Sequence, residues 1–175
     1  KNHWKHTSEC DIKGTNILLK GFSKFIKKGN KANLRLFEKG KDLKEAKYII
    51  SKLKIEKNIS WIKESSLSEF YKEISKADLI CDQFANSFPG IVTYDAYAIG
   101  RPVLANFRNE VFRKKYIGGL PGFNAKTSDD IYKKLVYITN NPKVLKSKGE
   151  ESRLFAEKNL CPKIFARFLI NFIIN

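Results

Sequence analysis

The sequence predicts an α/β fold in which helices cover both faces of a parallel sheet. Short apolar runs alternate along the chain with longer segments whose apolar residues recur every three or four positions. Turn residues separate the two kinds of segment, and strands that alternate with helices pair in parallel. No internal repeat or low-complexity linker divides the 175 residues, so we expect one domain spanning residues 1–175.

We expect a helix wherever apolar residues recur every three or four positions and a capping or helix-ending residue marks the boundary. Two pairs, Ser66 with Glu69 and Thr127 with Asp130, have the spacing of a capping box, which marks a helix start. Thr15 or Asn16 is the expected cap of the first helix. The expected helices are residues 17–26, 43–53, 66–77, 91–99 and 131–140, then one or two over 143–158 and an apolar terminal helix over 164–174.

Strands are expected at four short apolar or alternating runs. These are Leu34–Phe37, Asn58–Ile62, Asp78–Cys81 and Val103–Ala105, each flanked by turn residues. Residues 106–126 are interpreted as loop. With a helix after each of the strands, the expected arrangement is a Rossmann-like layering of helix, sheet and helix.

The chain is strongly basic, with 34 Lys and Arg against 18 Asp and Glu and a net charge of +16. Such a field favours anionic partners. However, the lysines are spread along every expected helix, and no arginine cluster or aromatic RNA-binding motif accompanies them, so we expect no nucleic-acid partner. Contact with an anionic membrane surface stays open, although no apolar stretch reaches the length of a transmembrane helix.

Three cysteines, Cys10, Cys81 and Cys161, are an odd number without metal-type spacing. We therefore expect free thiols and a reducing, cytoplasmic setting, with peripheral membrane contact as an option. The chain also lacks the GxGxxG and GxxxxGK[ST] motifs, a nucleophile elbow and a His/Cys/Asp cluster. Ordinary dinucleotide, P-loop, serine-hydrolase and metal sites are therefore not predicted.

Three loops follow parallel strands and are expected to share one edge of the sheet: residues 38–42, 63–66 and 82–90. A helix that starts at Gly90 presents unpaired N–H groups and a positive dipole end to that edge, which suits a diphosphate. Gly90 would let a ligand approach the backbone closely. Lys13 and Lys39, each followed by glycine, would neutralise phosphates, and Asp95 would accept hydrogen bonds from sugar hydroxyls.

Four stretches together match a known pattern: Lys13–Asn16, Leu34–Asp42, Asn58–Ile62 and Ala77–Val103. They resemble the C-terminal domain of retaining GT-B glycosyltransferases, most closely family 4 (glycosyl transferases group 1), whose members build surface glycans. The likeness extends over nearly the whole chain. The Glu-x7-Glu signature of that family falls on Ser87 and Asp95.

The resemblance implies a role for each matched position. Asp95 would hold the nucleotide ribose, and Ser87 stands where the family has the acid that contacts the donor hexose. Lys13 would contact the donor phosphates, and with Ser87 and Asp95 it forms the implied catalytic set. The implied donor-binding residues are Lys13, Gly14, Lys39, Gly40, Ile62, Lys63, Ser87, Phe88, Gly90, Ile91, Val92 and Asp95.

The implied activity is transfer of a hexose, with retention, from a nucleotide-diphosphate sugar to a glycan or lipid-linked acceptor. The resemblance implies neither a metal ion nor another cofactor, and it implies a role in surface polysaccharide biosynthesis. This chain would be the donor-binding half of a two-lobed enzyme, inactive without an N-terminal acceptor lobe.

The alternative is a catalytically impaired module that keeps the fold and binds a nucleotide or a membrane. Ser87 favours this alternative because it removes a charge from the sugar site. Asp82, Gln83 and Asn86 are the polar residues of the same loop that could substitute for the missing acid.

Overall fold

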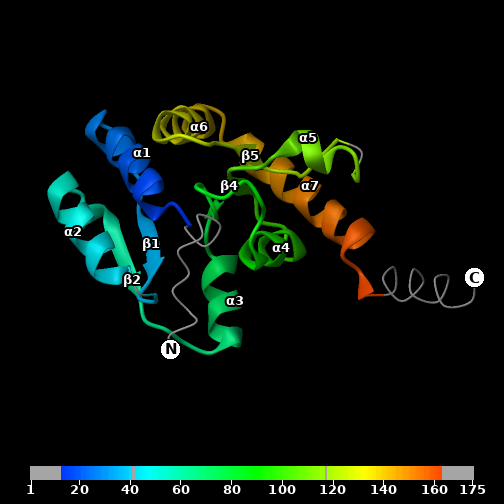
Figure 1. Ribbon diagram of the computed structural model, residues 1–175, viewed down its shortest axis with the longest axis horizontal. Helices are drawn as coiled ribbons and strands as arrows, with labels where there is room; N and C mark the ends of the chain where they lie inside the picture. The colour runs from blue at the N-terminus through cyan, green and yellow to red at the C-terminus, as the bar shows by residue number, and fades with distance from the viewer. Residues whose placement is uncertain (1–12, 41, 117, 163–175) are drawn as a thin grey trace, which may run out of the picture.

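Parallel strands lie between two layers of helices in the computed structural model (Figure 1), which describes residues 13–40, 42–116 and 118–162. The strands are β1 (Leu34–Phe37), β2 (Ile59–Ile62), β3 (Ile80–Cys81), β4 (Val103–Ala105) and β5 (Phe123–Asn124). The helices are α1 (Thr15–Lys27), α2 (Leu43–Leu53), α3 (Leu67–Ser75), α4 (Ile91–Ala98), α5 (Asn109–Phe112), α6 (Ser128–Asn140) and α7 (Lys143–Asn159), with a 3₁₀ turn η2 at Glu56–Asn58.

All strand pairings among the described residues are parallel, as predicted. β1 pairs with β2 from Leu34 opposite Ile59 to Phe37 opposite Ile62. β4 lies between β3 and β5, with Ile80 opposite Val103 and Leu104 opposite Phe123. In the described part of the chain the strands therefore form a two-stranded and a three-stranded sheet rather than one continuous ladder.

Side-chain alternation along β4 divides the core into two faces. Leu104 packs in a cluster with residues of α1 and α6, whereas Val103 and Ala105 pack in a cluster with residues of α3, α4 and α7. A third cluster contains Leu19 and Phe22 of α1 and Ile50 of α2, and residues of β1 and β2 pack against it. Helices thus cover both faces of the strands, which confirms the predicted α/β class.

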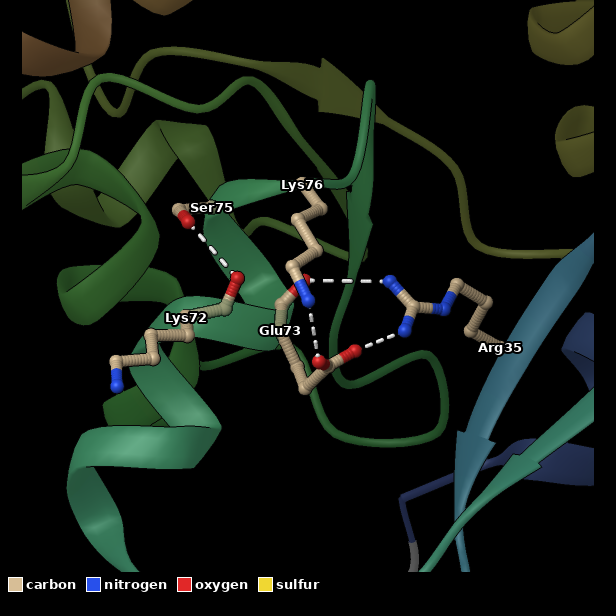
Figure 2. A network of polar contacts seen from close by, with 5 residues as sticks. All are labelled: Arg35, Lys72, Glu73, Ser75 and Lys76. Carbon is tan, nitrogen blue, oxygen red and sulfur yellow. Dashed lines mark hydrogen bonds and ion pairs between the residues drawn. The ribbon is translucent and has the colours of Figure 1, made fainter.

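Arg35 on β1 connects the two-stranded sheet to α3 (Figure 2). Its guanidinium contacts both the carboxylate and the backbone carbonyl of Glu73. Lys76 Nζ donates to the second carboxylate oxygen of Glu73 at 2.7 Å. The hydrogen bond from Lys76 and the contact with Arg35 lower the pKa of Glu73. Because the next residue, Ile74, is buried in the α3, α4 and α7 cluster, this network joins the two sheets at the surface.

Elements with strong periodicity or end signals were predicted best. The bounds of β1, α2 and β4 agree with the prediction, and both capping boxes are present, at Ser66 with Glu69 and at Thr127 with Asp130. Residues 143–159 form one helix, α7. The predicted terminal helix over 164–174 lies outside the described residues.

Four local predictions were wrong. The N-cap of α1 is Gly14, and Asn16 instead accepts the neighbouring N–H of Ile17. Asn58 belongs to η2, because its N–H donates to Ile55. β3 begins at Ile80 rather than Asp78, since pairing with β4 starts at that residue. Residues 106–126, interpreted as loop because they show no apolar periodicity, contain the short elements α5 and β5.

Candidate functional site

The Lys13–Gly14 turn is fastened to the loop of residues 82–90. The backbone carbonyl of Lys13 accepts the N–H of Phe84 at 2.8 Å. Gly14 has φ +75°, and a Cβ at this position would lie 2.6 Å from the backbone N of Ala85. Only glycine therefore permits both the turn and the close approach. The structure thus brings together two segments that the sequence marked separately, and the Lys13 side chain is exposed beside them.

β4 and the residues after it hold the same loop from its other side. Asn106, 6% exposed, donates from Nδ2 to the Phe84 carbonyl at 3.0 Å and to Ser87 Oγ at 3.3 Å. The N–H of Asn106 donates to the Gln83 carbonyl, and that of Arg108 donates to the Ser87 carbonyl. The Ser87 hydroxyl is thus part of the loop scaffold. Sequence reasoning missed Asn106, although a polar residue directly after a buried strand is a signal for such a role.

Gly90 does not serve the purpose predicted for it. Its φ is −80°, which any residue adopts. A Cβ there would lie 2.8 Å from both Asp82 Oδ2 and Gln83 Nε2, so side chains of the protein itself fill the space reserved for a ligand. The Gly90 N–H donates to Asp82 Oδ2 at 2.9 Å. The Asp82 carboxylate is therefore directed at the start of α4.

The first turn of α4 presents its next two amides, those of Ile91 and Val92, which have no acceptor within the helix. The Ile91 side chain is 80% exposed, whereas Val92 packs against the α3, α4 and α7 cluster. Phe88, also exposed, meets Phe112 edge-on with ring centroids 5.9 Å apart. This end of α4 combines a positive dipole with accessible apolar surface, which suits an anionic group attached to a larger ligand.

Asp95 lies one turn further along α4 and contacts α3. Tyr71 donates its hydroxyl to Asp95 Oδ1 at 3.4 Å, and the negative charge of Asp95 is the main cause that raises the pKa of Tyr71. The Tyr71 ring lies 5.6 Å from Phe70, whose ring lies 5.3 Å from Phe37 at the end of β1. A row of aromatic side chains therefore leads from the end of β1 to Asp95.

The loops after β1 and β2 meet through an exposed ion pair between Lys39 and Glu64. The carbonyl of Ile62 accepts the Glu38 N–H at 2.8 Å, which adds one rung beyond the strand pair. Gly40 has φ +108° with open space around its Cα, and the Lys63 side chain is exposed. The predicted edge residues are thus adjacent here. Lys39 is paired with Glu64, a partner that no sequence pattern indicated.

One groove of the described residues lies away from this edge. A groove of about 570 Å³ is lined by Asp78, Arg101 and Arg153 among others, at the amino ends of β3 and β4. Burial, and then the charge of Asp82, raise the pKa of Cys81 to about 12, so its thiol stays protonated. Among the described residues, no cluster of His, Cys, Asp and Glu is suited to a metal ion, and no helix has the length and apolarity to span a membrane.

The sequence profile of the family "Glycosyl transferases group 1" matches residues 11–155. The chain belongs to this family. The matched region contains the Lys13–Gly14 turn, the loop of residues 82–90 and all of α4. A sequence comparison with curated proteins found no match.

Solved structures of glycosyltransferases share the fold at low sequence identity. A mutant of TarM of S. aureus, solved with fondaparinux, α-GlcNAc-glycerol and UDP, aligns with a TM-score of 0.74 and 16% identity over 91% of this chain and 32% of TarM. HepE of Anabaena, solved with UDP and glucose, aligns with a TM-score of 0.70 and 15% identity over 92% of this chain and 44% of HepE. The pneumococcal O-GlcNAc transferase GtfA, solved with UDP and GlcNAc, aligns with a TM-score of 0.67 and 18% identity over 91% of this chain and 32% of GtfA. The chain therefore spans less than half the length of these enzymes, and its fold is the Rossmann-like fold of GT-B glycosyltransferases.

Proposed function

We propose that this chain is the donor-binding lobe of a retaining glycosyltransferase and that its carboxyl edge binds a nucleotide-diphosphate sugar. The attachment of the Lys13–Gly14 turn to the loop before α4 is the observation that carries the proposal. In this proposal the Lys13 ammonium group and the first amides of α4 face the same ligand, and both stabilise a departing diphosphate. Asp95 then holds the ribose, and no metal ion is needed.

The proposed nucleotide is a uridine diphosphate. TarM, HepE and GtfA were each solved with UDP, together with GlcNAc, its glycerol glycoside or glucose. The proposed donor is accordingly a UDP-hexose, and the proposed acceptor is a glycan or a lipid-linked sugar of a surface polysaccharide. The free thiols of Cys81 and Cys161 favour a reducing, cytoplasmic compartment.

Calorimetric titration of the chain with UDP, GDP and ADP tests the donor site. We expect UDP to bind, and we expect Lys13→Ala to weaken its affinity about tenfold, because a charge-assisted contact to phosphate is lost. Lys20→Ala is the matched control, since it removes another exposed lysine, one that lies in α1. An equal loss in both variants, or no heat with any nucleoside diphosphate, would contradict the proposal.

Retention is tested on the enzyme that carries both lobes. An α-linked UDP-hexose should give an α-linked product, identified by the coupling constant of the anomeric proton in ¹H NMR. A β-linked product would show inversion. The chain by itself should transfer little, because the acceptor groups and the exclusion of water come from a second lobe.

A catalytically impaired binding module is the second candidate, and Ser87 is the observation that favours it. Its hydroxyl accepts from Asn106 and offers no charge to a sugar. This function predicts that the two-lobed protein binds UDP and UDP-hexose with similar affinity and turns over neither. Measurable transfer to any acceptor rejects it.

Peripheral membrane contact is proposed from the net charge of +16. The chain should sediment with vesicles that contain anionic lipid and not with neutral ones, and added salt should release it. Sedimentation with both kinds of vesicle, or with neither, contradicts an electrostatic contact.

A further inference from the structure

One carboxylate oxygen connects both ends of the loop of residues 82–90 with the first turn of α4. Asp82 directly follows β3, and its Oδ2 accepts the Gly90 N–H at 2.9 Å and the Thr93 hydroxyl at 2.6 Å. Thr93 is fully buried, and its own N–H donates to the Gly90 carbonyl at 3.1 Å. Opening the loop at Gly90 would break the contact between the Gly90 N–H and Asp82.

The residue type at position 90 matches this arrangement. Gly90 has an ordinary φ of −80°, so its backbone conformation does not require glycine. A Cβ would lie 2.8 Å from Asp82 Oδ2 and 3.0 Å from Oδ1. A side chain at position 90 would therefore have to displace the carboxylate of Asp82.

Asp82 also supplies a negative charge that the first turn of α4 lacks. The first turn of α4 contains no acidic residue, and no side chain of its N-cap accepts an N–H. A carboxylate from the end of β3 therefore complements the positive end of the helix and satisfies one of its first amides. This is also the helix end at which the proposed function places the diphosphate of the donor.

We propose that Asp82 is a positioning residue with two effects on the donor site. It holds Gly90 and the first turn of α4 in place before the donor binds. Its charge opposes that of the diphosphate and so limits how tightly the nucleoside diphosphate product is held, which favours product release. The inference rests on the proposed donor site, and it adds a residue that acts through α4 rather than by touching the sugar.

Three variants separate the geometry from the charge. Asp82→Asn keeps an oxygen that can accept from both Gly90 and Thr93, and it removes the charge. Asp82→Ala removes the acceptor as well. Thr93→Val keeps the buried shape, the charge and the Gly90 contact but removes the hydroxyl donor, so it measures the part of the positioning that depends on Thr93.

Calorimetric titration with UDP at low and high salt is the experiment. We expect Asp82→Asn to bind UDP about three- to tenfold more tightly at low salt, with a smaller gain at high salt, because screening weakens the repulsion in the wild type. We expect Asp82→Ala to bind about tenfold more weakly, and Thr93→Val, which keeps the Gly90 contact, to fall between Asp82→Ala and the wild type. Amide hydrogen exchange at Gly90 should be faster in Asp82→Ala than in Asp82→Asn.

A variant that merely loses stability cannot bind UDP more tightly, so the gain in Asp82→Asn distinguishes this inference from a structural role. Unchanged or weaker UDP binding by Asp82→Asn, with an unchanged melting temperature, would overturn the charge effect. Unchanged Gly90 exchange and UDP affinity in Asp82→Ala would overturn the positioning effect. If the wild-type chain binds no nucleoside diphosphate, the proposed function itself fails, and this inference fails with it.

Discussion

The two groups of loops at the carboxyl edge are held by different kinds of contact. The loop of residues 82–90 is tied to Lys13, Asn106, Arg108 and Thr93 through backbone groups and half-buried or buried side chains. The loops after β1 and β2 meet through Lys39 and Glu64, whose side chains are 68% and 59% exposed. One half of the proposed donor site is therefore built into the core, and the other half lies on the surface.

This difference indicates how the proposed donor is recognised. Contacts with buried partners cost much to break and keep a site in one shape before the ligand arrives, whereas exposed ion pairs contribute little and open readily. We expect the phosphate side of the site, at α4, to be preorganised. The base side, near Ile62 and Lys63, should adapt to the nucleotide.

The largest effect is expected from the side chain that anchors the buried loop. Phe84 is 1% exposed, and Phe84→Ala should lower the free energy of unfolding by about 3–5 kcal/mol because it leaves a cavity in the core. Phe88→Ala, in the same loop but 48% exposed, should cost less than about 1 kcal/mol. Urea denaturation of both variants measures the difference. Equal losses would show that the loop is not anchored through Phe84.

Replacing one glycine in each half of the edge compares how tightly the two halves are packed. Gly14→Ala should cost about 2–4 kcal/mol, because a left-handed φ is combined with a contact on the backbone of Ala85. Gly40→Ala, at φ +108° with open space, should cost only the conformational strain of about 1–2 kcal/mol. Thermal unfolding compares the variants, and UDP titration should show the greater loss in Gly14→Ala. A larger cost at Gly40 would contradict the comparison.

The link between the two sheets should weaken in acid. The pKa of Glu73 is lowered from its ordinary value of about 4.5 by Lys76 and Arg35, so its stabilising effect is complete above that value. The effect is lost as the pH falls through the lowered pKa of the folded state. The melting temperatures of the wild type and Glu73→Gln should therefore differ at neutral pH and converge in acid.

Lys72→Gln is the control for this pH dependence, because it removes a charge from α3 while Lys72 contributes only its backbone carbonyl to the network (Figure 2). The difference between Lys72→Gln and the wild type should not vanish in the same pH range. A constant difference between the wild type and Glu73→Gln from neutral to acid pH would mean that the ion pairs of Glu73 contribute nothing.

The smallest effect on stability is expected at the exposed ion pair. Lys39→Ala and Glu64→Gln should each change the free energy of unfolding by less than about 0.5 kcal/mol, because both side chains are largely hydrated. Glu64→Gln should strengthen UDP binding if Lys39 contacts the phosphates, since it releases the ammonium group. Stability losses as large as that of Gly14→Ala would show that this half of the edge is also built into the core.

Local pattern by itself determined much of this protein. The spacing of apolar residues was sufficient for β1, α2 and β4, and residues three apart were sufficient for the capping boxes of α3 and α6. The matched stretches also indicated the glycosyl transferases group 1, and the sequence profile of that family confirms this membership. These features depend on contacts within one turn or one strand, which neighbouring residues encode directly.

Only the tertiary structure decided how the candidate site is assembled. That Gly14 lies on Ala85, that Asn106 holds Ser87 and that Gly90 faces Asp82 are contacts between residues 8 to 71 positions apart. The strand β5 likewise forms by pairing with β4, and both α5 and β5 have too few residues to show a period in the sequence. Gly90 was marked by the sequence as a place for a ligand, and the folded chain fills that place with its own carboxylate.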